Sequence, residues 1–206
     1  MSAGKAMAMN YLLALADQSA LARSDPSISL ESKRACALES GATFSPCRRY
    51  RYKLWRRWQG GRPLCCCLLN PSTADEARNG PTVERCQRRA VAMGFPGLIV
   101  VNLFAFRATD PKAMMLVDDP IGPDNNAAIL EAARESSVTL CGWGGLGAFR
   151  GRGRAVLERL WEARVNTMIL GLTKGGEPRH LASGLLADLT SCTAPVCAQR
   201  APAWRR

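Results

Sequence analysis

The chain has 206 residues, with 28 Lys or Arg against 17 Asp or Glu, which gives a formal net charge of +11. A chain of this length can bury about 70% of its unfolded surface in one domain, so its folding requires neither a metal ion nor a disulfide. The nine cysteines form no CxxC pair and the chain has one histidine, which argues against a zinc site and predicts free thiols in a reducing cytoplasm, without a metal or a cofactor.

Residues 1–40 show no strong periodicity, so we expect an N-terminal extension that is poorly ordered or forms a short amphipathic helix. Its apolar run, YLLALA, is short and ends at Asp17. Neither a signal peptide nor a membrane-spanning helix fits this pattern. We therefore predict no association with a membrane and leave the oligomeric state open.

The segment from residue 48 to residue 62, RRYRYKLWRRWQGGR, contains seven Lys or Arg and no acid. Its side chains alternate in character, which predicts a half-buried strand. Leu54 would face one side of this strand, and Arg51 and Lys53 would face the other. Two interpretations of the charge stay open: a binding surface for a polyanion such as DNA, RNA or a nucleotide, or a solvated basic edge.

Four apolar runs follow, each apolar on both faces as in parallel strands covered by helices, at residues 63–70, 97–104, 137–144 and 166–173. Helices are predicted between them, beginning at Pro81 and Thr82, at the candidate cap Asp124 and after Gly153. The alternation predicts an α/β domain over residues 41–180. We expect a three-layer α/β/α sandwich with a central, mainly parallel four-stranded sheet plus an N-terminal strand or hairpin. Residues 181–206 form a divergent C-terminal tail.

Polar segments follow the four apolar runs, as NPSTAD, NLFAFRATDP, GWGGLG and TKGGEPRH. In open parallel sheets, ligands bind where the strands end at their carboxyl edge, so these segments are expected to face one crevice. NPST has a second interpretation, because Asn, Ser and Thr also cap helices and Pro fits the first turn. The glycine-rich GGLGAFRGRGR lacks the spacing and the Lys-Ser/Thr ending of a phosphate loop.

Five motifs, LLNPSTAD, GPTVERC, VVNLFAFRATDP, DPIGPDN and GLTKGGEPRH, resemble in their order those of the bacterial and phage family called domain of unknown function 1643. The resemblance covers residues 41–180 and implies an α/β fold without an established activity. The order of the polar loops, with a histidine after the last strand, is also similar to that of the uracil-DNA glycosylase superfamily. That similarity implies a cleft for a nucleobase and hydrolysis of an N-glycosidic bond.

The glycosylase resemblance implies roles for individual residues. Asn70 or Asp75 would orient a water molecule, and His180 would donate a hydrogen bond to the departing base. Asn102 and Arg107 would contact a base edge or a phosphate. The other predicted substrate-binding residues are Pro71, Ser72, Thr73, Lys174 and Arg179.

Several of these residues also have a purely structural interpretation. Arg107 and Lys174 are typical of solvated loop charges, and His180 of a surface histidine. Trp143 is expected in the core rather than as a stacking platform. The sequence after PRH departs from the family pattern, which favours a second hypothesis, a non-catalytic module that binds nucleic acid or an anion. A third hypothesis is an enzyme that acts on a small nucleotide-like molecule.

Overall fold

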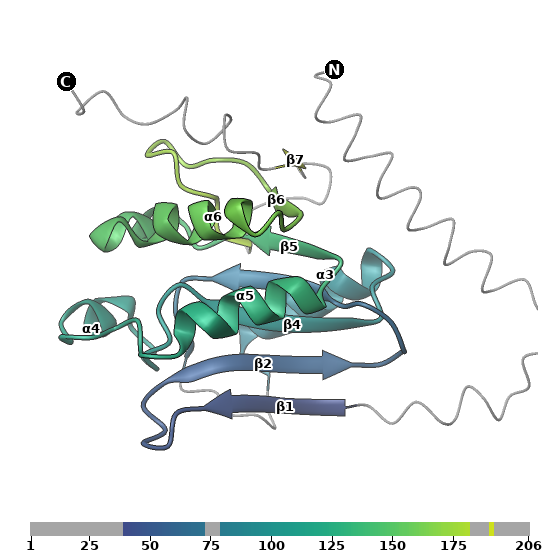
Figure 1. Ribbon diagram of the computed structural model, residues 1–206, viewed down its shortest axis with the longest axis horizontal. Coiled ribbons are helices and arrows are strands. Elements are labelled where there is room, and N and C mark those ends of the chain that lie inside the picture. Colours follow the sequence, from purple (N-terminus) through teal and green to yellow (C-terminus); the bar gives the residue numbers. More distant parts are fainter. Residues whose placement is uncertain (1–38, 73–78, 182–189, 192–206) are drawn as a thin grey trace, which may run out of the picture.

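The fold is taken from a computed structural model that describes residues 39–72, 79–181 and 190–191. In this part of the chain seven strands form one sheet, in the spatial order β1-β2-β4-β3-β5-β6-β7 (Figure 1). The strands are β1 (Glu39–Phe44), β2 (Arg51–Arg57), β3 (Leu64–Leu68), β4 (Gly97–Asn102), β5 (Val138–Cys141), β6 (Thr167–Ile169) and β7 (Thr190–Ser191).

Four adjacent strands run parallel, because β4 pairs with β3, β3 with β5, and β5 with β6 in that sense. The hairpin of β1 and β2 joins this block antiparallel along β4, and β7 joins it antiparallel along β6. Every residue of β3 and β4 is buried, as expected for strands covered on both faces. The prediction of a mixed α/β fold is confirmed, and the sheet is larger than predicted because β7 extends it.

The helices of the described residues are α3 (Pro81–Ala92), α4 (Pro111–Met115), α5 (Asn125–Glu135) and α6 (Arg152–Glu162), with a 3-10 segment η1 (Gly145–Gly151). Pro81 stands in the first turn of α3, where a missing N–H is tolerated. Asp124 occupies the N-cap position of α5, as predicted, although its side chain makes no capping hydrogen bond. The short helix α4 was not predicted, and the side chain of Asp110 caps it by accepting a hydrogen bond from the backbone N–H of Lys112.

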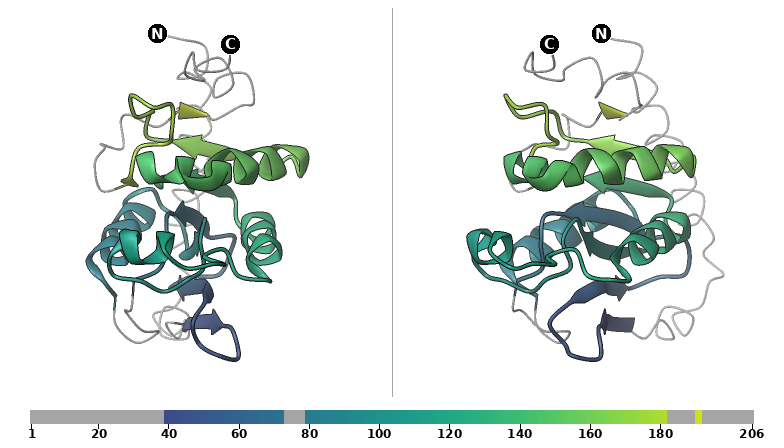
Figure 2. Two further views of the ribbon diagram at one scale, coloured as in Figure 1. Left: turned by 90° about the vertical axis from the view of Figure 1, so that its left-hand side faces the viewer. Right: turned by 60° about the vertical axis from the view of Figure 1, so that its left-hand side comes forward.

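The helices pack on both faces of the sheet, with α5 and α6 on one face and α3 on the other (Figures 1 and 2). The three adjacent cysteines divide between these faces, since Cys65 and Cys67 belong to the α5 and α6 core and Cys66 to the α3 core. Burial raises the pKa of the Cys67 thiol to about 12, so this thiol is protonated at neutral pH. These cysteines therefore act as small apolar side chains, as the sequence predicts.

Strand β2 contains an irregularity that overturns its predicted alternation. Thr43 of β1 pairs with Lys53. The next residue, Phe44, pairs with Arg51, which leaves Tyr52 as an extra residue in β2. A bulge of this kind redirects the side chains that precede it. Lys53 contacts α5, whereas Arg51 lies on the α3 side of the sheet, so the expectation that they share a face is wrong.

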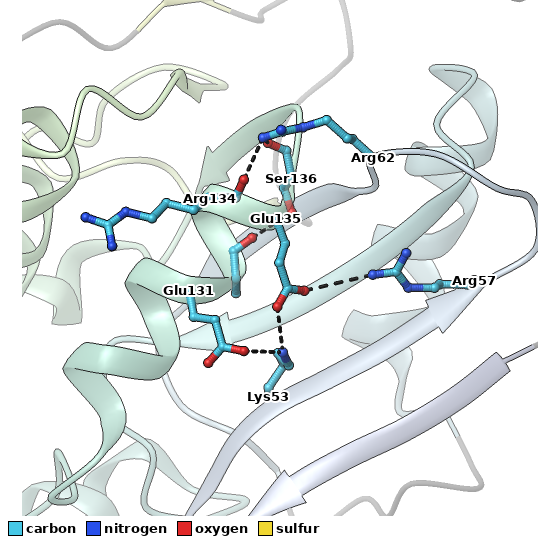
Figure 3. Close-up of polar contacts among 8 residues, drawn as sticks. Lys53, Arg57, Arg62, Glu131, Arg134, Glu135 and Ser136 are labelled. Atoms are coloured by element: carbon cyan, nitrogen blue, oxygen red, sulfur yellow. Dashed lines mark hydrogen bonds and ion pairs between the residues drawn. The ribbon is translucent and has the colours of Figure 1, made fainter.

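Two cations of β2 form ion pairs with acids of α5 (Figure 3). The Nζ atom of Lys53 lies 3.3 Å from Oε1 of Glu131 and 3.2 Å from Oε1 of Glu135. An Nη atom of Arg57 lies 3.9 Å from the other carboxylate oxygen of Glu135. These pairs join the edge hairpin to the helix that covers it.

Two further cations of the basic segment bind polar groups within the fold. Arg62 donates hydrogen bonds of 2.6 Å and 2.7 Å to the backbone carbonyls of Arg134 and Ser136, where α5 ends (Figure 3). A cation at this position also interacts favourably with the helix dipole. Arg56 is buried and donates a 3.2 Å hydrogen bond to Oδ1 of Asn79. The second half of the basic segment is thus engaged in holding the domain together.

Among the described residues, no helix combines the length and the apolar character that a membrane crossing requires.

Candidate functional site

A cavity of about 390 Å³ lies at the carboxyl ends of the parallel strands. Its volume falls within the roughly 300–1,000 Å³ that is usual for small-molecule sites. Its apolar lining includes Leu68, Leu69, Val83, Val100 and Trp143. Among the described residues, its polar lining consists of Arg51, Asn70, Ser72, Thr82, Asn102, Thr109 and His180. A few converging polar groups over apolar walls are typical of ligand sites.

The cavity lies at the topological switch point of the sheet, where successive strands begin to be added on the opposite side of β3. From β3 the chain passes through α3 to β4 on one side, and from β5 it passes through α6 to β6 on the other side. The loops after β3 and β5 therefore diverge and leave a crevice between them. Leu69 and Asn70 line this crevice after β3, and Trp143 and Leu146 line it after β5.

Asn70 links the loop after β3 to the loop after β4. Its Nδ2 donates a 2.7 Å hydrogen bond to the backbone carbonyl of Ala108. The backbone N–H of Ala108 in turn donates to the carbonyl of Pro71 at 3.0 Å. Within the described part of the chain no hydrogen bond uses Oδ1 of Asn70, so this oxygen is available as an acceptor for a ligand or a water molecule.

Asn102 ends β4 and is only 1% exposed at the cavity wall. Among the described residues its Nδ2 has no acceptor, although it is buried. Its backbone is held from behind, because Nδ2 of Asn125 donates to the carbonyls of Asn102 and Leu103 at 3.0 Å and 2.9 Å. The guanidinium of Arg152 also donates to the Leu103 carbonyl, at 2.8 Å. A buried donor without an acceptor costs about 1–3 kcal/mol, and at a cavity wall it indicates a place for a ligand acceptor.

Arg51 is a cavity residue that the sequence analysis missed. Its side chain is almost completely buried, with 2% exposed, and its backbone N–H donates a 2.9 Å hydrogen bond to the carbonyl of Ala105. Burial, followed by the positive charges of Arg107 and Arg56, lowers the pKa of Arg51 to about 10. The guanidinium is therefore still charged at neutral pH. The sequence places Arg51 only within a basic segment, because the bulge that turns its side chain towards the cavity leaves no clear sequence pattern.

His180 lies at the cavity after β6 and is half-buried. Burial, and to a lesser extent the positive charge of Arg85, lowers the pKa of its imidazole below the ordinary value of 6.5. The ring is therefore neutral at pH 7 and carries one N–H donor and one acceptor nitrogen.

Trp143 lies in the core and also forms part of the cavity wall. Its Nε1 donates a 2.6 Å hydrogen bond to Oε2 of Glu177, which comes from the loop after β6. Burial raises the pKa of the Glu177 carboxyl, although the hydrogen bond from the indole opposes this effect. Gly147 and Gly153 leave the necessary space, since a Cβ atom at either position would lie too close to the indole ring. Glu177 was not predicted, because nothing in the sequence marks it as the partner of a tryptophan.

Three predicted cationic residues lie away from the cavity wall. Arg107 stacks over the ring of Phe44, with 5.0 Å from Cζ to the centroid, and donates a hydrogen bond to the Arg48 carbonyl. Lys174 is exposed, and Arg179 donates a 3.0 Å hydrogen bond to the backbone carbonyl of Leu172. The predicted contact of Arg107 and Lys174 with phosphate, and of Arg179 with the substrate, stays a prediction.

Among the residues predicted in the first polar loop, Asn70 and Ser72 line the cavity, and Pro71 is buried beside them. Thr73 and Asp75 lie outside the described residues. A search of the described residues finds no group of three or more His, Cys, Asp or Glu side chains that could hold a metal ion.

These observations define an α/β protein with a polar cavity at the carboxyl edge of its sheet. The family model for a protein of unknown function, DUF1643, matches residues 51–180, and the chain belongs to this family. No curated protein and no solved structure gives a significant match to the chain. The family resemblance expected from the motifs is therefore confirmed, whereas these comparisons give no support to the glycosylase resemblance.

Proposed function

We propose that the cavity binds the nucleobase of a nucleotide, either free or within a nucleic acid, and that the protein hydrolyses its N-glycosidic bond. The observation that carries the proposal is the convergence of Asn70, Asn102 and His180 on one cavity from the ends of three different strands. The apolar walls suit the faces of a base, and the amide and imidazole groups suit its polar edge. The resemblance of the loop order to uracil-DNA glycosylases supports the same reaction.

The reaction adds water across the glycosidic bond. The water oxygen bonds to C1′ of the sugar, while the C1′–N bond breaks and its electron pair leaves with the base. The proton released by the water is finally taken up by the base. Oδ1 of Asn70 would accept a hydrogen bond from the attacking water and orient it. Asp75 is the other candidate for this role, and it lies outside the described residues.

His180 would stabilise the departing base. As the bond breaks, negative charge develops on the base and its carbonyl oxygens. A neutral imidazole can donate a hydrogen bond to such an oxygen, and the lowered pKa of His180 keeps the ring in this form at pH 7. The Nδ2 donor of Asn102 would bind a further acceptor on the base edge.

A non-catalytic module for single-stranded nucleic acid is a second candidate function. It is favoured by the exposed Arg48 and Arg49, which lie over the aromatic rings of Phe44 and Phe106 at 4.5 Å and 5.4 Å. Cations beside aromatic side chains are common where proteins bind single strands. Arg107 also lies over the Phe44 ring, and its positive charge contributes to the lowered pKa of Arg51.

Incubation of the protein with DNA that carries uracil and other modified bases, followed by detection of abasic sites, tests the proposal. Release of a base by the wild type, with strong losses in His180→Ala and Asn70→Ala, would support hydrolysis. Arg159→Ala is the control, since this exposed cation of α6 lies outside the cavity wall and its variant should retain activity. Binding of the same oligonucleotides without any base release would favour the non-catalytic module.

A further inference from the structure

We infer that Arg51 binds an oxyanion of the ligand, so that the cavity selects molecules with a phosphate or carboxylate group over their neutral counterparts. The identity of the rest of the ligand rests on the proposed function, whereas its negative charge does not. A nucleoside monophosphate has both the nucleobase of the proposed function and a negatively charged group for Arg51.

The first support is the position of the Arg51 side chain. The bulge at Tyr52 places it on the α3 side of the sheet, where it lines the cavity with Val100 and Val83. In a regular strand it would have faced α5 together with Lys53. Bulges next to functional sites commonly redirect a side chain in this way.

The second support is the local charge. Arg107 and Arg56 are close enough to Arg51 to lower its pKa, so positive charges reinforce one another beside the cavity. Among the described residues that line the cavity there is no Asp or Glu. A guanidinium has five N–H donors, so it can contact neighbouring protein groups and a ligand together. An anion bound here would reduce the repulsion among the three arginines.

The third support is the chemistry of the neighbouring groups. Asn102 lines the same cavity, and its buried Nδ2 has no acceptor among the described residues. The neutral imidazole of His180 adds an N–H donor from the opposite loop. These donors are uncharged and suit the base, whereas a guanidinium pairs with the oxygens of a phosphate or carboxylate, so Arg51 can hold the charged group of the same ligand.

Isothermal titration with a panel of nucleosides and their 5′-monophosphates tests the inference, with inorganic phosphate and acetate as isolated anions. We expect the wild type to bind at least one monophosphate about 10- to 100-fold more tightly than its nucleoside, the range for hydrogen bonds to charged groups. Arg51→Gln should remove this preference. Arg51→Lys keeps the positive charge but not the planar guanidinium, so this variant should keep part of the preference for the monophosphate. The control is Arg159→Gln, an exposed cation of α6 outside the cavity wall, which should bind like the wild type.

Different results separate the inference from the proposed function. Equal wild-type affinities for a nucleoside and its monophosphate would overturn the inference and leave nucleobase binding in place. A preference that survives in Arg51→Gln would also overturn it. Binding of inorganic phosphate or acetate alone, lost in Arg51→Gln and unaffected by the presence of a base, would support the inference and reject nucleobase binding. The anion that binds more tightly then shows whether the site prefers a phosphate or a carboxylate. If Arg51→Gln fails to fold, the wild-type comparison and Arg51→Lys decide the question.

Discussion

The two ends of strand β2 carry similar numbers of cations but place them in different surroundings. At the end that leads into β3, Lys53 and Arg57 pair with acids of α5, and Arg62 binds the carbonyls that end this helix. At the opposite end, Arg48 and Arg49 are exposed over aromatic rings, and Arg51 is buried at the cavity.

The difference shows that a run of basic residues is not by itself a binding surface. The structural interpretation of residues 48–62 describes the second half of the segment, which serves packing between strand and helix. For the first half, binding of an anionic ligand stays a prediction. Charge at the cavity end should therefore affect function, and charge at the helix end should affect stability.

The largest expected effect is on activity at the cavity end. If the protein releases a base, His180→Ala should lower kcat by about 100-fold or more, since one donor to a developing oxyanion typically contributes this much. Its melting temperature should change little, because the side chain is only half-buried. Base-release kinetics and a thermal melt provide the two readouts. Lys53→Met is the control from the helix end, and equal losses of activity in both variants would contradict the division between the two ends.

The next effect is the salt dependence of binding to a single-stranded oligonucleotide. If only Arg48, Arg49 and Arg107 contact phosphates, the slope of log K against log salt should be about −2, at about −0.7 per contact. If all seven cations of residues 48–62 took part, the slope would be about −5 on the same basis. Titrations between 50 and 200 mM salt, roughly the range in which such contacts show strongly, distinguish these values. A slope near the steeper value would show that the ion pairs with α5 open on binding.

A smaller effect is expected on stability at the helix end. Lys53→Met should lower the free energy of unfolding by about 1 kcal/mol or less, because a partly exposed ion pair contributes within this range. The loss should shrink in high salt, which screens the interaction in the wild type. Denaturant unfolding measures both quantities. Arg49→Met is the comparison, and a larger loss there would reverse the roles of the two ends.

The smallest effect concerns the pH dependence of stability. The pKa of His180 is lower in the folded protein than its ordinary value of 6.5, so the folded state favours the neutral ring. Its contribution to stability is present above pH 6.5 and is lost as the pH falls from there through the folded-state pKa, because the unfolded chain takes up the proton first. Thermal melts from pH 7.5 to pH 5 should show a steeper decline for the wild type than for His180→Asn. Parallel declines would show that the imidazole is as solvated in the folded protein as in the unfolded one.

Much of the fold was predictable from local pattern. The apolar runs of β3 and β4 identify buried strands, and Pro81 and Asp124 mark the starts of α3 and α5 where the structure has them. The strand β7 and the helix α4 were missed, because two residues and five residues are too short for a periodic signal.

The candidate site was predictable in part, from polar residues at or after the ends of buried strands. Asn102 ends β4, Asn70 comes two residues after β3 and His180 lies in the loop after β6, and all three line the cavity. The roles of Arg51 and Glu177 were not predictable. The first depends on a bulge, and the second on a contact between the loops that follow β5 and β6.

The sequence by itself determined the family, the α/β class and the loops that carry polar groups to one edge of the sheet, because these features depend on residues close together in the chain. Only the tertiary structure decided which cations serve stability and which face the cavity. Lys53 and Arg51 are two residues apart and chemically alike, yet one pairs with α5 and the other lines the cavity. The register of β1 against β2 determines which of the two side chains faces α5 and which faces the cavity. A register arises from pairing between strands rather than from either strand alone.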